Sequence, residues 1–209
     1  NPDACPYAKG HYDRVNDAVY DMLQTTDRMT REALKAQAMK YQVCPFEMAL
    51  DVSVWVDAII CDYNYVFDPD AHLKRFFSEG GKGDYIFLID EAHNLVERGR
   101  KMYSAQLVKE QVMEIRRLVK ASDVKLAKRL EECNKQLLAL KKECETYQVL
   151  DGVSHVALKL MNVMSELERY LEEPQNQEKR DEVLDFYFQV RSFLNIYEAL
   201  DENYKIYTE

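Results

Sequence analysis

The chain has 209 residues, of which 47% are hydrophobic and 31% are charged, and this composition predicts one or two globular domains with an apolar core. Its formal net charge of −9 gives no bulk attraction for a polyanion. No run of 18 apolar residues occurs, which argues against a transmembrane helix, and five cysteines among Lys- and Glu-rich helices do not suggest a disulfide scaffold.

Three helices are predicted in the amino-terminal part. The first spans about 12–24 and carries its apolar residues on one face. The second spans 31–41, where Thr30 is placed to accept a hydrogen bond from the first turn. The third spans 46 to about 56, and Pro45 fits its first turn because proline lacks an N–H that would be unpaired there anyway.

Two apolar runs further along are predicted to be strands. Ala58-Ile59-Ile60-Cys61 is short, whereas Tyr85-Ile86-Phe87-Leu88-Ile89 is longer and continuous, which is typical of a strand buried on both faces of a parallel sheet. Short helices are predicted at 70–77 and 94–103. This order of strand, helix, strand and helix predicts part of a parallel α/β layer.

The second apolar run ends in Asp90-Glu91-Ala92-His93. Ligand chemistry in α/β sheets gathers at the carboxyl ends of strands. In phosphoryl chemistry, one acid there can hold Mg²⁺ through water while a second orients the attacking water. The alternative is a strand that ends in a solvated Asp-Glu turn.

From Ser104 onward the pattern changes to amphipathic helices. Apolar residues recur at alternating spacings of three and four, which predicts four helices with narrow apolar stripes. Short loops favour antiparallel neighbours, and we therefore expect residues 104–209 to form a helical bundle or a pair of hairpins. One stripe is predicted to run through Leu126, Leu130, Cys133, Leu137, Leu140, Cys144 and Tyr147.

The five cysteines fall into two groups. Cys133 and Cys144 lie in the apolar stripe of one predicted helix and Cys61 in a predicted strand, so these three are expected to pack as small hydrophobes. Cys5 and Cys44 each precede a proline and an aromatic residue at a helix boundary, where the helix dipole and free N–H groups favour a thiolate. Those properties suit an iron–sulfur ligand, but a cubane cluster needs four thiolates, and the missing pair has no candidates here.

Three segments together strongly resemble the XPD/DinG-type iron–sulfur DNA helicases of superfamily 2, in particular the bacterial DinG-like members. They read CPFEMA at 44–49, VDAIICDYNYVFDP at 56–69 and IFLIDEAHNL at 86–95. The resemblance is most specific over residues 1–103. Residues 104–209 match only in kind, as a helical insertion after the DEAH motif, where the family carries its arch domain.

The resemblance implies a role for each candidate site residue. Asp90 resembles the carboxylate that holds the Mg²⁺ of Mg-ATP through water, and Glu91 resembles the base that orients the hydrolytic water. His93 resembles the residue that links the nucleotide site to the second motor domain. Cys5 and Cys44 resemble the third and fourth ligands of a [4Fe–4S] cluster, whose first two ligands would lie upstream of this chain.

The resemblance also implies a domain plan. Residues 1–45 are expected to be part of an iron–sulfur domain, 46–103 part of motor domain 1 with the DEAH motif, and 104–209 an all-α arch domain of about four helices. The predicted fold class is mostly α, with a fragment of a parallel α/β motor domain. Because the chain begins without Met and has no secretory signal, we expect an internal segment of a longer, cytoplasmic bacterial protein.

The implied parent enzyme couples ATP hydrolysis to 5′ to 3′ translocation on single-stranded DNA, with fork or flap DNA as substrate and no membrane partner. No G-x-x-x-x-G-K-[ST] loop occurs, so the isolated segment is expected to be inactive, and without two ligands its cluster is expected to be missing. Candidate strand contacts are the mixed basic and aromatic residues Tyr7, Lys9, His11 and Arg14. The alternative is a solvated face, which three aspartates on the same predicted helix favour.

Two other functions compete with the helicase hypothesis. One is a non-enzymatic helical protein-interaction module in which Asp90 to His93 are only a structural turn. The other is a metalloenzyme that uses His93, His11, Cys5 and Cys44, although no close Cys/His pairing of the usual metal-binding spacing supports it.

Overall fold

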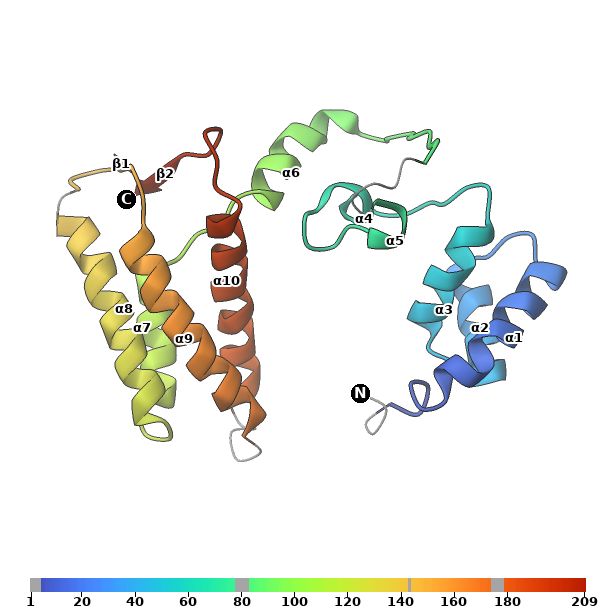
Figure 1. Ribbon diagram of the computed structural model, residues 1–209, viewed down its shortest axis with the longest axis horizontal. Helices are drawn as coiled ribbons and strands as arrows, with labels where there is room; N and C mark the ends of the chain where they lie inside the picture. Colours follow the sequence, from blue (N-terminus) through green and yellow to red (C-terminus); the bar gives the residue numbers. More distant parts are fainter. Residues whose placement is uncertain (1–4, 78–82, 143, 174–178) are drawn as a thin grey trace. The chain divides into compact units, whose positions relative to one another are not determined.

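The computed structural model describes residues 5–77, 83–142, 144–173 and 179–209. The chain divides into two units, Asn1–Asp62 and Tyr63–Glu209. Over the described ranges there are ten α-helices and one two-stranded sheet, which confirms the mostly α fold class (Figure 1). None of the described helices combines the length and the apolar character that crossing a membrane requires.

The first unit is a cluster of three helices followed by a short 3₁₀ helix. Thr30 Oγ1 accepts the N–H of Ala33, and Pro45 occupies the first turn of the third helix, so both predicted helix starts are confirmed. The helices share one core, which includes Val15, Met22, Ala38, Val43 and Met48. The elements are α1 (His11–Thr25), α2 (Arg31–Tyr41), α3 (Pro45–Val52) and η1 (Ser53–Trp55).

The second unit begins with short helices. The predicted helix at 70–77 is reduced to its last turn, and a one-turn helix forms where none was predicted. The elements are α4 (Asn64–Phe67), α5 (Lys74–Phe77), η2 (Ala92–Asn94) and α6 (Leu95–Met102).

Neither predicted strand forms part of a sheet. Among the described residues, 58–61 and 85–89 pair with no other strand. Ile86 and Leu88 are 91% and 94% exposed, whereas Tyr85 and Phe87 pack against the aromatic rings of α5. The run keeps the alternation of a strand, but a parallel strand buried on both faces needs neighbours that the described segments do not supply. The prediction that this run is buried in a parallel α/β layer is therefore corrected.

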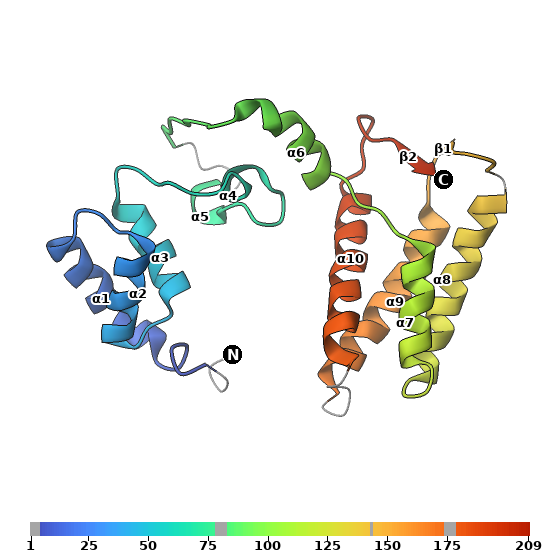
Figure 2. The same ribbon diagram turned by 180° about the vertical axis from the view of Figure 1, so that it is seen from behind.

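Four long helices form the predicted bundle in the second unit. They are α7 (Lys109–Val119), α8 (Val124–Lys142), α9 (Ser154–Glu172) and α10 (Arg180–Glu198). Each helix packs on the next, and α10 packs back on α7, which lies behind α8 and α9 in Figure 1 and in front of them in Figure 2. The apolar stripes meet in one core, as expected from their spacing.

A small antiparallel ribbon, β1 (Gln148–Leu150) with β2 (Ile206–Thr208), was not predicted. Leu150 and Ile206 face the bundle core, while Val149 and Tyr207 lie opposite each other on the exposed face. Tyr147, predicted to continue the stripe of α8, is also exposed because that helix ends at Lys142. The predicted stripe therefore ends earlier than its spacing suggested.

The three cysteines that were expected to pack as small hydrophobes differ in burial. Cys133 and Cys144 are buried, as predicted, and the Cys144 thiol donates to the carbonyl oxygen of Thr208 at 3.4 Å. Cys61 is exposed, which corrects its assignment as a packing residue, because the strand that was to bury it does not form.

A charged network joins the α7–α8 turn to α9. Arg169 donates through Nη2 to Asp123 and through Nε to Glu166, the latter at 3.0 Å. Lys125 Nζ lies 2.7 Å from the other Glu166 oxygen. Asp123 and Glu166 are both buried, and two hydrogen-bonded cations compensate the desolvation of Glu166. Lys125 first and then Arg169 hold the pKa of the Glu166 carboxyl below its ordinary value.

We expect Leu130→Ala to lower the free energy of unfolding of the bundle by about 2–5 kcal/mol, because the fully buried side chain leaves a cavity in the core. Leu138→Ala, an exposed position on the same helix, is the matched control and should change it by less than about 1 kcal/mol. Urea denaturation of both variants measures the difference. Equal losses in the two variants would contradict the assigned core.

We expect Glu166→Gln to lower the free energy of unfolding at pH 7 by about 1–3 kcal/mol, since it removes charge-assisted hydrogen bonds to Lys125 and Arg169. The folded-state pKa of Glu166 lies below its ordinary 4.5, so this stabilisation is complete above about pH 4.5 and is lost as the pH falls through the folded-state pKa. Urea denaturation measures the free energy of unfolding of both proteins, and the difference between variant and wild type should be smaller at pH 3 than at pH 7. Glu172→Gln, exposed on the same helix, should show no such gap.

Candidate functional site

The three predicted chemical residues of the DEAH motif lie in one tight turn. Asp90 Oδ1 accepts the backbone N–H of Glu91 at 2.9 Å, and Glu91 Oε2 lies 3.3 Å from His93 Nε2. The Glu91 and His93 side chains are 66% and 74% exposed, and Asp90 is exposed as well. The structure thus brings the predicted residues together where a ligand in solution can reach them.

The backbone of this turn is strained at Glu91. Its φ and ψ of 48° and 40° are left-handed, a conformation that costs a residue with a Cβ about 1–2 kcal/mol. The N–H of Asn94 donates to the Glu91 carbonyl at 2.9 Å and closes the turn into η2. Strained backbone persists only where its surroundings enforce it, and such positions concentrate at functional sites. In the described ranges, the other non-glycine residue with positive φ is Gln42, two residues before Cys44.

The carboxylates of the turn suit a hard cation. Mg²⁺ takes oxygen ligands, retains several waters and commonly binds proteins through one or two carboxylates. One Asp90 oxygen accepts the N–H of Glu91, the next residue, whose backbone is left-handed. No group of three or more metal-binding side chains occurs among the residues with a described position.

The two predicted cluster ligands lie in the first unit, at the approaches to two helices. Cys44 immediately precedes α3, and its side chain makes no capping hydrogen bond. Cys5 precedes α1, and its carbonyl accepts the N–H of Ala8 at 3.0 Å. Both are free thiols and half-buried. Two thiols that form no disulfide and are only half-buried fit two ligands of an iron–sulfur cluster, and the amino terminus of α3 favours thiolate charge on Cys44.

The four candidate strand contacts do not share one exposed face. His11 is 4% exposed, and its Nδ1 accepts the backbone N–H of Cys44 at 3.2 Å. Arg14 donates to the carbonyls of Tyr41 and Gln42, at 3.0 and 2.7 Å, and thereby fastens the start of α1 to the end of α2. Lys9 is exposed and Tyr7 is half-buried. Sequence reasoning assigned His11 to the surface and missed its contact with Cys44, for which the only signal was its position at the start of a helix.

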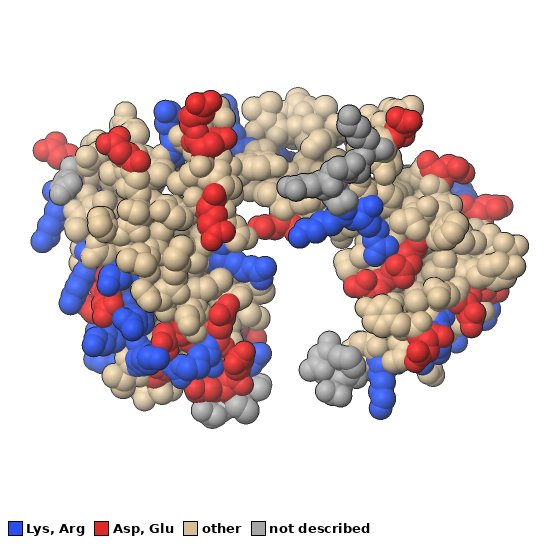
Figure 3. Space-filling view, viewed as in Figure 1, with Lys and Arg blue, Asp and Glu red and all other residues tan. Residues whose placement is uncertain are grey.

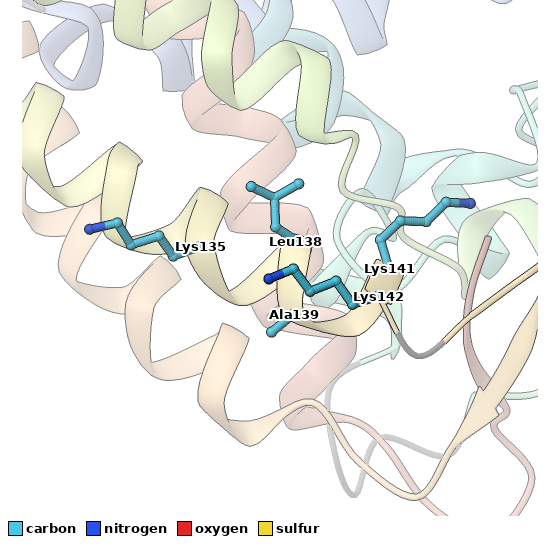
Figure 4. A pocket seen from close by; sticks show the side chains of 5 residues that line it. All are labelled: Lys135, Leu138, Ala139, Lys141 and Lys142. Atoms are coloured by element: carbon cyan, nitrogen blue, oxygen red, sulfur yellow. The ribbon is translucent and has the colours of Figure 1, made fainter.

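A shallow depression on α8 is lined by Lys135, Leu138, Ala139, Lys141 and Lys142 (Figure 4). It contains none of the predicted nucleotide or cluster residues. On the face shown in Figure 3, basic side chains of the bundle are interleaved with acidic ones, in keeping with ion pairs such as that between Lys159 and Glu132. This depression therefore lacks the carboxylates that characterise the DEAH turn.

Comparison with known proteins adds the family. The DEAD_2 family model matches residues 1–112, more than half of the chain. A Fanconi anemia group J protein homolog from Gallus gallus is 31% identical over 81 residues, which are 39% of this chain and 6% of that protein. The chain therefore matches only a small part of this relative. No solved structure matches the chain. The matched residues include the DEAH turn and both predicted ligand cysteines. Because the family model matches more than half of the chain, the chain belongs to the DEAD_2 family of XPD/FANCJ-type helicases.

Proposed function

We propose that this chain is an internal segment of an ATP-dependent DNA helicase of the iron–sulfur type, similar to the bacterial DinG-like members. In the complete enzyme, ATP hydrolysis drives 5′ to 3′ translocation on single-stranded DNA. Residues 1–45 contribute to the iron–sulfur domain, 46–103 to motor domain 1 and 104–209 to the arch. Because the chain has no phosphate-binding loop, it hydrolyses no ATP by itself.

The observation that carries the proposal is the strained turn at Asp90, Glu91 and His93. Asp90 holds Mg²⁺ through water, and Glu91 accepts a proton from the water that attacks the γ-phosphate. The contact of His93 with Glu91 at 3.3 Å supports its role as the link between the base and the second motor domain. Exposure of all three side chains supports a site that is completed by other parts of the enzyme.

Cys5 and Cys44 supply two thiolates to a [4Fe–4S] cluster in the complete protein. Their support is that both thiols are half-buried and form no disulfide, in a unit with its own helical core. The remaining two ligands come from sequence outside this chain. Of the candidate strand contacts, Lys9 and Tyr7 keep exposed or half-exposed side chains, and they contact single-stranded DNA in the proposed enzyme.

The alternative is a helical protein-interaction module. The observation in its favour is the outer face of the ribbon, where Val149 and Tyr207 are exposed beside Tyr147. In that case Asp90 and Glu91 form only a turn, and their replacement leaves every activity of the complete protein unchanged.

We expect Glu91→Gln in the complete protein to lower DNA-dependent ATP turnover by about 10²–10⁴-fold, because the amide cannot accept the proton of the attacking water. Nucleotide affinity should persist, since the phosphate contacts lie elsewhere. Steady-state hydrolysis and equilibrium nucleotide binding measure the two effects. Glu97→Gln, on the exposed face of α6, should turn over normally. Normal turnover by Glu91→Gln would contradict the assignment of the base.

We expect the complete protein, purified without oxygen, to be brown and to hold about four iron atoms per chain. Cys44→Ser should lose most of the iron, while Cys61→Ser should keep it. Cys61 is a suitable control because partial desolvation of its sulfur first, and then the adjacent Asp62, raise the pKa of its thiol, although the residue as a whole is exposed, and a raised pKa disfavours the thiolate that iron requires. Iron analysis and visible absorbance measure the outcome. A colourless, iron-free wild-type protein would contradict the cluster assignment.

A further inference from the structure

The buried ring of His11 connects the two cysteine-bearing segments. Nδ1 of His11 accepts the backbone N–H of Cys44 at 3.2 Å, and the ring is almost completely enclosed within the first unit. Neither the sequence pattern nor the comparisons assign this residue a role in the cluster. His11 contacts Cys44, which we propose as a cluster ligand, and this contact therefore affects where the Cys44 thiol lies.

The direction of this hydrogen bond fixes the state of the ring. A backbone N–H can only donate, so Nδ1 of His11 carries no proton and Nε2 carries the hydrogen of the neutral ring. Without the ring, the Cys44 N–H would lose its acceptor in a poorly solvated place. The Cys44 side chain does not cap α3, and its backbone is held by this contact on the N–H side and by the N–H of Met48, which donates to the Cys44 carbonyl at 3.0 Å, on the other.

A series of three hydrogen bonds joins the two cysteines through His11. The Cys5 carbonyl accepts the N–H of Ala8 at 3.0 Å, and the Ala8 carbonyl accepts the N–H of His11 at 3.3 Å. The His11 ring then accepts the N–H of Cys44. Two links are between main-chain groups, and the third joins the His11 ring to the main chain of Cys44. Together they connect the backbones of Cys5 and Cys44, which are distant in sequence.

We propose that His11 is a positioning residue that sets the separation of Cys5 and Cys44 for the iron–sulfur cluster. The inference rests on the proposed function, which places the cluster on these two thiols. Partners that orient metal ligands without touching the metal commonly change metal affinity by about 10–100-fold when they are replaced. His11 holds the ligand through its main chain, so its effect is on geometry and retention of the cluster.

The test uses the complete protein, purified without oxygen, with three variants. His11→Phe removes the acceptor and retains a ring, while His11→Asn retains an acceptor oxygen near the position of Nδ1. His72→Phe is the matched control, because this histidine contacts the Asp68 carbonyl in the other unit. The readouts are the rate at which visible absorbance bleaches in air, the iron content and the low-temperature EPR spectrum of the reduced protein.

We expect His11→Phe to bleach about tenfold faster than wild type or more, with an altered EPR spectrum, while His11→Asn and His72→Phe stay close to wild type. Unchanged bleaching and EPR in His11→Phe would overturn the inference, as would equal damage in a folded His11→Asn. If His11→Phe fails to fold, the His11→Asn result decides between these outcomes. Iron-free wild-type protein would instead contradict the cluster itself and remove the inference with it.

Hydrogen exchange on the 209-residue chain tests the contact without a cluster. The Cys44 amide should be protected in wild type and exchange faster in His11→Phe, with His11→Asn retaining most of the protection. Equal exchange of this amide in wild type and His11→Phe would also overturn the inference, because the acceptor would then have no effect on the ligand backbone.

Discussion

A helix satisfies its own backbone, whereas a strand needs a neighbour, and this difference decides how each part of the chain is organised. Residues 109–119 and 124–142 form helices that need only an apolar partner, and the four-helix bundle supplies one within a single unit. Residues 85–89 need hydrogen-bonded strands on both sides, and none of the described segments pairs with them. Ile86 and Leu88 lie on the same side of this extended run, and both are exposed over the described residues.

Helix ends raise the same requirement on a smaller scale, because their outermost N–H and C=O groups have no partner in the helix. Arg14 supplies donors to the last carbonyls of α2, and the His11 ring supplies an acceptor to the residue before α3. Asp123 does the same for α8 by accepting the N–H of Leu126 at 2.9 Å. In the first unit, Arg14 and His11 also contact the segments that carry the two cysteines. The same two side chains therefore satisfy helix ends and help to place the thiols of Cys5 and Cys44.

Local signals in the sequence predicted the parts of the fold that depend on nearby residues. Thr30, Pro45 and the apolar spacing after Ser104 identified helices whose starts and packing the structure confirms. Features that depend on distant residues were not predictable in this way. The β1–β2 ribbon pairs Val149 with Tyr207 across two helices, and His11 meets Cys44 across α1 and α2. The pattern proposed Asp90, Glu91 and His93 as candidate site residues, but the left-handed backbone at Glu91 is not encoded by a glycine or asparagine and carried no local signal.

That left-handed residue connects the fold to the proposed chemistry. The described hydrogen bonds that hold Glu91 come from its sequence neighbours Asp90 and Asn94, and the segment before it pairs with no described strand. A conformation that costs about 1–2 kcal/mol persists only where its surroundings enforce it. Over the described residues, the Asp90 carboxylate and the N–H of Asn94 supply that enforcement, so the contacts that close the turn also set the direction in which the Glu91 side chain leaves it. In the proposed helicase, the angle at which Glu91 meets the attacking water would therefore depend on these contacts, and weakening them would reduce turnover even with Glu91 and His93 intact.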